Sequence, residues 1–101
     1  MIPWLAPGEP FPPVDEALVE PNGLLAAGEE LTMARLVDAY SQGIFPWFND
    51  DEPVLWWSPN PRMVLFVDEL RVSRSLRKTL RSGRYVVTSD TAFVDVMRGC
   101  S

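Results

Sequence analysis

GIFPWFNDDEPVLWWSPNPR, residues 43–62, is the stretch that decides how this chain folds. It contains three of the four tryptophans, and proline recurs through it. Proline fixes φ and removes a backbone donor, so rings and prolines at this density predict a rigid apolar surface. We predict a strand over 53–58, after an acidic turn at 50–52 that we interpret as a solvated loop rather than a metal site.

The tryptophans of this stretch divide into two groups. Trp56 and Trp57 lie next to each other in the predicted strand and therefore point to opposite faces, so at least one of them belongs to the core. Trp47 follows Pro46 outside that strand. We take Trp47 and Phe48 as the candidates for contact with a substrate, because such rings can stack bases or line an apolar pocket. Core packing remains the alternative for these rings.

Upstream, six prolines between residues 3 and 21 predict an extended arm without regular structure. The apolar segment 24–27 fits either a strand or one helical turn, and its periodicity does not decide. Thr32 is a predicted N-cap for a helix that ends at Gln42, with Gly43 as the left-handed residue after it. We interpret this helix as an amphipathic support helix with Tyr40 in the core.

Downstream, the sequence predicts a βαβα series. The uniformly apolar segment 63–67 is typical of a strand buried on both faces, and 85–89 alternates as a second strand. Ser73 caps the clearest helix, over 73–82, and we predict Asp90 as the cap of a last helix. The predicted class is α+β: a Pro-rich arm plus a small N-terminal domain with an aromatic-rich strand segment (1–61), then the opening part of an incomplete α/β domain (62–101).

The net charge of -5 conceals a strong division. Residues 1–61 carry ten acidic and one basic residue, a net charge of -9, whereas residues 62–101 carry eight basic and four acidic residues, a net charge of +4. Within 73–82 four cations share one helical face, opposite Leu76 and Leu80. Cations without acidic neighbours predict an anionic partner, with a solvated face as the alternative. The predicted phosphate-binding residues are Arg71, Arg74, Arg77, Lys78, Arg81 and Arg84.

Two absences limit the chemistry. There is no histidine, and Cys100 is the only cysteine, so neither a His-activated nucleophile nor the usual zinc ligand sets can be assembled from these residues. No apolar run approaches the ~20 residues of a membrane span, and the N-terminus does not match a signal peptide. We therefore expect a cytoplasmic protein with no cofactor, no bound metal and no membrane association.

Four motifs resemble the leucyl/phenylalanyl-tRNA–protein transferases: PNGLLAAG (21–28), GIFPWF (43–48), LWWSPNPR (55–62) and VSRSLRK (72–78). They keep the family's order and spacing from residue 21 onward. One local difference is Gly28-Glu29-Glu30, where the family usually has two glycines before the acidic residue.

The resemblance implies an aminoacyltransferase that moves Leu or Phe from aminoacyl-tRNA to the N-terminal Arg or Lys of acceptor proteins, marking them for degradation by the N-end rule. It implies a small N-terminal domain followed by an acetyltransferase-like domain. It also implies that Trp47 lies beside the aminoacyl-adenosine end, and that Arg74, Arg77, Lys78 and Arg81 hold the tRNA acceptor arm.

Family members are roughly twice as long as this chain, so we expect a partial transferase whose catalytic residues lie beyond Ser101, with none in this chain. The full-length form is expected to be a monomer, and the fragment to self-associate through an open sheet edge. Two alternatives remain: a non-catalytic tRNA- or RNA-binding module that uses the basic helix 73–82, and a protein-interaction domain that uses the aromatic residues.

Overall fold

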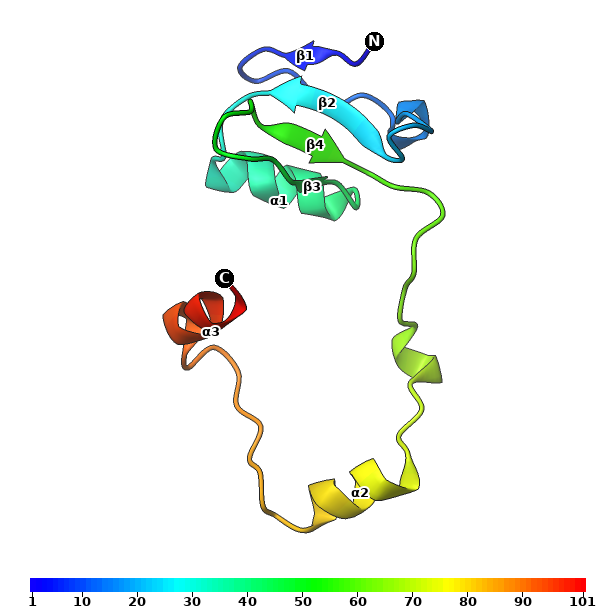
Figure 1. Cartoon of the computed structure of the whole chain (residues 1–101), viewed down its shortest axis with the longest axis vertical. Coiled ribbons are helices and arrows are strands. Elements are labelled where there is room, and N and C mark those ends of the chain that lie inside the picture. The colour runs from blue at the N-terminus through cyan, green and yellow to red at the C-terminus, as the bar shows by residue number, and fades with distance from the viewer. The chain divides into compact units, whose positions relative to one another are not determined.

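The computed structural model describes residues 1–101, and it divides into two compact units, Met1–Met63 and Val64–Ser101. The first unit contains a four-stranded mixed sheet and one α-helix (Figure 1). The second contains two α-helices and a short 3-10 helix at Val67–Glu69. The chain therefore has the mixed α and β content of the predicted class.

The sheet of the first unit has the strand order β1-β2-β4-β3. β1 (Trp4–Leu5) runs parallel to β2 (Leu24–Gly28), β2 is antiparallel to β4 (Leu55–Trp57), and β4 is antiparallel to β3 (Phe45–Pro46). The predicted strand over 53–58 is thus confirmed in its central part. The undecided segment 24–27 is a strand, because backbones on both sides pair with it.

The Pro-rich arm differs from its prediction. It forms β1 and a 3-10 helix at Val14–Glu16, and it contributes two buried residues, Leu5 and Phe11. Proline fixes φ at its own position and restricts the residue before it, but it does not prevent the side chains of the apolar residues in between from packing. The buried core of the unit consists of Leu5, Phe11, Leu25, Ala26, Ala39, Ile44 and Trp56.

The helix α1 (Met33–Ser41) has the predicted ends but not the predicted buried face. The Thr32 hydroxyl accepts a hydrogen bond from the N–H of Arg35 at 3.1 Å, and Gly43 has a φ of 74°. The buried residues, however, are Arg35 and Ala39. Tyr40 is exposed, so its prediction as a core residue was wrong.

The second unit contains the helices α2 (Arg74–Arg81) and α3 (Phe93–Cys100). Ser73 caps α2 as predicted, because its hydroxyl accepts from the N–H of Leu76 at 3.1 Å. For α3 the prediction was wrong: the N-cap residue is Ala92, and Asp90 has a φ of 56° rather than the extended conformation of an N-cap.

The two strands predicted downstream of the hairpin, 63–67 and 85–89, do not form, and their residues are exposed. A strand is held by hydrogen bonds to a neighbouring backbone, and no segment between Val64 and Ser101 provides one. The predicted βαβα series is therefore present only through its helices.

Candidate functional site

The aromatic hairpin, residues 43–62, comprises β3, the acidic turn and β4, and lies wholly in the first unit. Phe45 pairs with Trp57 and Pro46 with Trp56 across the two strands. The acidic turn closes the hairpin: the Glu52 carboxylate accepts from the backbone N–H of Asn49 at 2.8 Å, and the Glu52 N–H donates to the Asn49 carbonyl at 3.0 Å. This turn is a specific structure rather than a loose loop.

Trp56 is the core tryptophan of the hairpin, with no exposed surface. Its indole N–H donates to the Gly28 carbonyl at 2.9 Å, and its ring meets Phe11 edge to face, with 5.0 Å between centroids. Trp57, on the other face of β4, is only half-buried. The prediction that at least one of the two belongs to the core is confirmed.

Trp47 is presented to solvent, with 73 % of its surface exposed, and its neighbour Phe48 is half-buried. The backbone of Trp47 is nevertheless fixed, since its N–H donates to Leu55 at 3.0 Å and its carbonyl accepts from the Trp57 indole at 2.8 Å. An exposed ring on a fixed backbone can stack against a planar ligand.

Arg62 is a residue of this site that sequence reasoning did not single out. Its guanidinium donates to the Gly43 carbonyl at 2.9 Å and lies 5.8 Å from the centre of the Phe45 ring. It thereby joins the last residue of the hairpin sequence to the first. The only signal for it was its position at the end of the LWWSPNPR motif.

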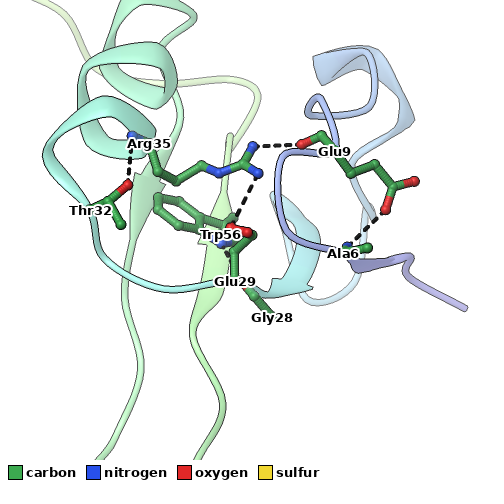
Figure 2. Close-up of polar contacts among 7 residues, drawn as sticks. All are labelled: Ala6, Glu9, Gly28, Glu29, Thr32, Arg35 and Trp56. Carbon is green, nitrogen blue, oxygen red and sulfur yellow. Dashed lines mark hydrogen bonds and ion pairs between the residues drawn. The ribbon is translucent and has the colours of Figure 1, made fainter.

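A buried arginine of α1 contacts both the arm and Glu29, the residue that follows β2 (Figure 2). Arg35 donates to the Glu9 carbonyl at 2.7 Å, pairs with the Glu29 carboxylate at 3.4 Å, and lies 4.9 Å from the centre of the Phe11 ring. Sequence reasoning missed this residue too, since a lone base in an acidic half gives no sign of burial. The contacts of Arg35 with Glu9 and Phe11 hold the arm in place, and Phe11 in turn packs against Trp56.

The cationic helix α2 belongs to the second unit and is described by itself. Its four basic residues recur at i, i+3, i+4 and i+7, and all are exposed. The single ion pair of the chain is Arg35–Glu29, so none of the predicted phosphate-binding cations has a carboxylate partner. Six free cations, including Arg71 and Arg84 beside the helix, form a surface that can take a polyanion.

One surface depression, of about 170 Å³, is walled by Ser58 and Asn60 at the end of the hairpin and by residues of the arm. Two others in the first unit, of about 660 and 350 Å³, share Gly8, Glu29 and Thr32 in their walls and include neither Trp47 nor a residue of the hairpin. In the second unit a depression of about 310 Å³ lies at the start of α3, around Phe93. The two candidate surfaces are therefore exposed faces rather than enclosed pockets.

No helix of the structure has both the length and the apolar character needed to cross a membrane.

Comparison with known proteins gives one consistent result. Two family models match, described as "Leucyl/phenylalanyl-tRNA protein transferase N-terminal domain" over residues 29–60 and "Leucyl/phenylalanyl-tRNA protein transferase" over residues 64–101. Proteins named leucyl/phenylalanyl-tRNA–protein transferase match the whole chain: 61 % identity in Nitrosospira multiformis, 63 % in Chromobacterium violaceum and 61 % in Cellvibrio japonicus. The match includes the Pro-rich arm, which the motifs did not cover.

These matches define the class as tRNA–protein transferases. The chain belongs to the leucyl/phenylalanyl-tRNA–protein transferase family. It spans 44 % of the length of the Nitrosospira protein and 43 % of the other two.

Proposed function

We propose that this chain forms part of an aminoacyltransferase that moves Leu or Phe from aminoacyl-tRNA to the N-terminal Arg or Lys of acceptor proteins. The observation that carries the proposal is the match of the whole chain to transferases of that name, at 61–63 % identity in the three relatives above. Such tagging belongs to N-end rule degradation and takes place in the cytoplasm.

Two surfaces support this function. The cations of α2, with Arg71 and Arg84, suit the phosphates of a tRNA acceptor arm, since they are exposed and unpaired. Trp47 and Phe48 suit the aminoacyl-adenosine end, because the Trp47 ring is exposed on a fixed backbone. Each surface is assigned within its own unit.

The proposed mechanism requires the protein to position its two substrates more than to activate a bond. The aminoacyl ester is already activated by the tRNA, so the protein needs to hold two substrates together and to help remove a proton from the acceptor amine. Residues of the chain supply the first role. We propose that the second role belongs to residues in the part of the relatives that this chain does not span, where an acetyltransferase-like domain that begins at residue 62 would be completed.

A chimera tests the proposal. Residues 1–101 would replace the corresponding segment of the Chromobacterium violaceum relative, and transfer of labelled leucine from Leu-tRNA to a protein that begins with Arg would be measured. A protein that begins with Asp is the matched acceptor control. We expect transfer to the first and not to the second. A folded chimera without transfer, when the parent relative is active, would overturn the proposal.

The isolated chain distinguishes the alternatives. Salt-sensitive tRNA binding, combined with an inactive chimera, favours a non-catalytic tRNA- or RNA-binding module, which the unpaired cations of α2 support. If neither the isolated chain nor the chimera binds tRNA, a protein-interaction domain is favoured. Sedimentation of the active chimera tests the expectation that the full-length form is a monomer.

A further inference from the structure

We propose that Trp57 is a positioning residue for Trp47: its indole N–H fixes the Trp47 backbone, and this fixation makes the exposed Trp47 ring a preorganised stacking surface. The inference deepens the proposed function, because it rests on the role assigned there to Trp47. Its structural part, the coupling of the two tryptophans, stands independently of any ligand.

The first observation is that Trp47 has both of its backbone polar groups engaged by β4. Its N–H donates to the Leu55 carbonyl at 3.0 Å, and its carbonyl accepts from Trp57 Nε1 at 2.8 Å. The second contact replaces a ladder hydrogen bond, because β3 ends at Pro46. A side chain thus holds the first residue beyond the end of the strand.

The second observation is that the neighbours of Trp47 are also restrained. Pro46, in β3, has its φ fixed by its ring. On the other side, Asn49 donates its backbone N–H and its side-chain amide to the Glu52 carboxylate, at 2.8 and 3.2 Å. Between these two restraints the Trp57 contact is the hydrogen bond that fixes the Trp47 carbonyl.

The third observation is that the Trp47 side chain itself has little support, since 73 % of its surface is exposed. Its direction is therefore set through the backbone. A surface that is ordered before binding loses less conformational freedom when a ligand stacks on it. Loss of one hydrogen bond of this kind corresponds to a change of roughly 2- to 10-fold in affinity.

The test without ligand uses Trp57→Phe, which keeps an aromatic ring and removes the N–H. Trp4→Phe is the control, because Trp4 is also exposed and its indole makes no hydrogen bond. With fluorinated tryptophan, the ¹⁹F resonance of Trp47 is expected to shift and broaden in Trp57→Phe and to stay unchanged in Trp4→Phe. An unchanged Trp47 resonance in Trp57→Phe would overturn the proposal.

A second variant covers the case in which Trp57→Phe does not fold. Replacement of the Trp57 indole by benzothiophene, through chemical synthesis, keeps the shape of the ring system and lacks only the N–H. The same change in the Trp47 resonance is expected, with a small change in the thermal midpoint.

The test with ligand is a double-mutant cycle in the chimera described above, with an amide-linked leucyl-adenosine as the probe. We expect Trp57→Phe to weaken probe affinity roughly 2- to 10-fold when Trp47 is present and to have no effect in a Trp47→Ala background. Equal weakening in both backgrounds would show a general structural role and overturn the proposal.

The two tests separate the two ideas. If the probe does not bind the unmutated chimera, the role proposed for Trp47 fails, whereas the resonance experiment still decides whether Trp57 positions Trp47. If the probe binds and the ¹⁹F resonance of Trp47 is unchanged in Trp57→Phe, the positioning proposal fails and the proposed function stands.

Discussion

At the scale of single residues, the N-terminal unit depends on one buried cation. Arg35 is 8 % exposed and contacts the arm through Glu9 and Phe11, and the end of β2 through Glu29. A buried charge is tolerated only where partners compensate for its lost hydration. Arg35 therefore makes the position of the arm part of the fold rather than an attachment to it.

Arg35→Met tests that role. The substitution retains much of the apolar stem and removes the partner of Glu29 and of the Glu9 carbonyl, so we expect a loss of about 3 kcal/mol in the free energy of unfolding. Urea denaturation followed by tryptophan fluorescence measures it. Arg84→Met is the control, since Arg84 is exposed with no ion pair, and it should change stability by less than about 0.5 kcal/mol. Equal effects of the two variants would contradict the assignment.

Glu29 carries a second residue-scale prediction, because its φ of 72° lies in the left-handed region. Glu29→Gly and Glu29→Ala both remove the carboxylate and differ in the Cβ atom, so the glycine variant should be more stable than the alanine variant by about 1 kcal/mol. Thermal unfolding of the two variants measures the difference, and a more stable alanine variant would show that the position is unstrained.

At the scale of elements, close contact between two loops sets the geometry of the sheet. Gly23 lies against Pro59, and the Ser58 N–H donates to the Gly23 carbonyl at 2.7 Å. These contacts join the start of β2 to the end of β4. The LWWSPNPR and PNGLLAAG motifs are therefore adjacent in space, which explains why both need their small or rigid residues.

Gly23→Ala should disrupt this junction. A Cβ at residue 23 would lie 2.5 Å from the backbone N and Cα of Pro59, whereas a Cβ at Gly8 would meet nothing within 4 Å. Both glycines have positive φ, so Gly8→Ala should cost about 1 kcal/mol and Gly23→Ala about 1–3 kcal/mol more. Chemical denaturation of the two variants measures both changes in the free energy of unfolding, and their difference is the cost of the clash with Pro59. Equal losses of stability in the two variants would show that the junction can relax.

The cationic helix carries the other element-scale prediction. Changing Arg74, Arg77, Lys78 and Arg81 to Gln keeps helix propensity and removes four charges. If these residues contact phosphates, tRNA affinity should fall, and the slope of log affinity against log salt should become shallower by roughly 3 to 4. Lysine at the three arginine positions is the charge-preserving control and should retain the slope. An unchanged slope in the Gln variant would refute phosphate binding by this face.

At the scale of the whole molecule, the two units differ in how they are held together. Met1–Met63 has a core centred on Trp56 and a hydrogen-bonded sheet. In Val64–Ser101 no residue is buried, and each α-helix has eight residues. Helices that short are marginal in water without tertiary packing.

Hydrogen exchange should report this difference directly. Amides of β2 and β4 are expected to exchange through global unfolding of the first unit, whereas amides of α2 and α3 should exchange at least about 100-fold faster. Mass spectrometry of peptic fragments measures both groups in one sample. Comparable protection from exchange in the two units would contradict this expectation. It would show that residues 64–101 are stabilised although none of them is buried.

Much of the local structure was predictable from sequence, because its causes are local. The caps at Thr32 and Ser73, the glycines after α1 and α2 and the turn after Trp47 follow from neighbours within a few residues. The same holds for the prediction that Trp56 and Trp57 point to opposite faces of a strand, although which of the two is buried was not predicted. The candidate surfaces followed in the same way, since helical spacing alone places four cations on one face of α2. Their binding roles remain predictions.

Tertiary structure alone decided the rest. The burial of Arg35, the core position of Phe11 and the pairing of β1 with β2 depend on contacts between distant segments. The same reason explains the failures at 63–67 and 85–89: their composition favours strands, but a strand exists only where another backbone accepts its hydrogen bonds. Sequence by itself determined which segments can cap, turn or present charge, whereas pairing and burial required partners that no local pattern specifies.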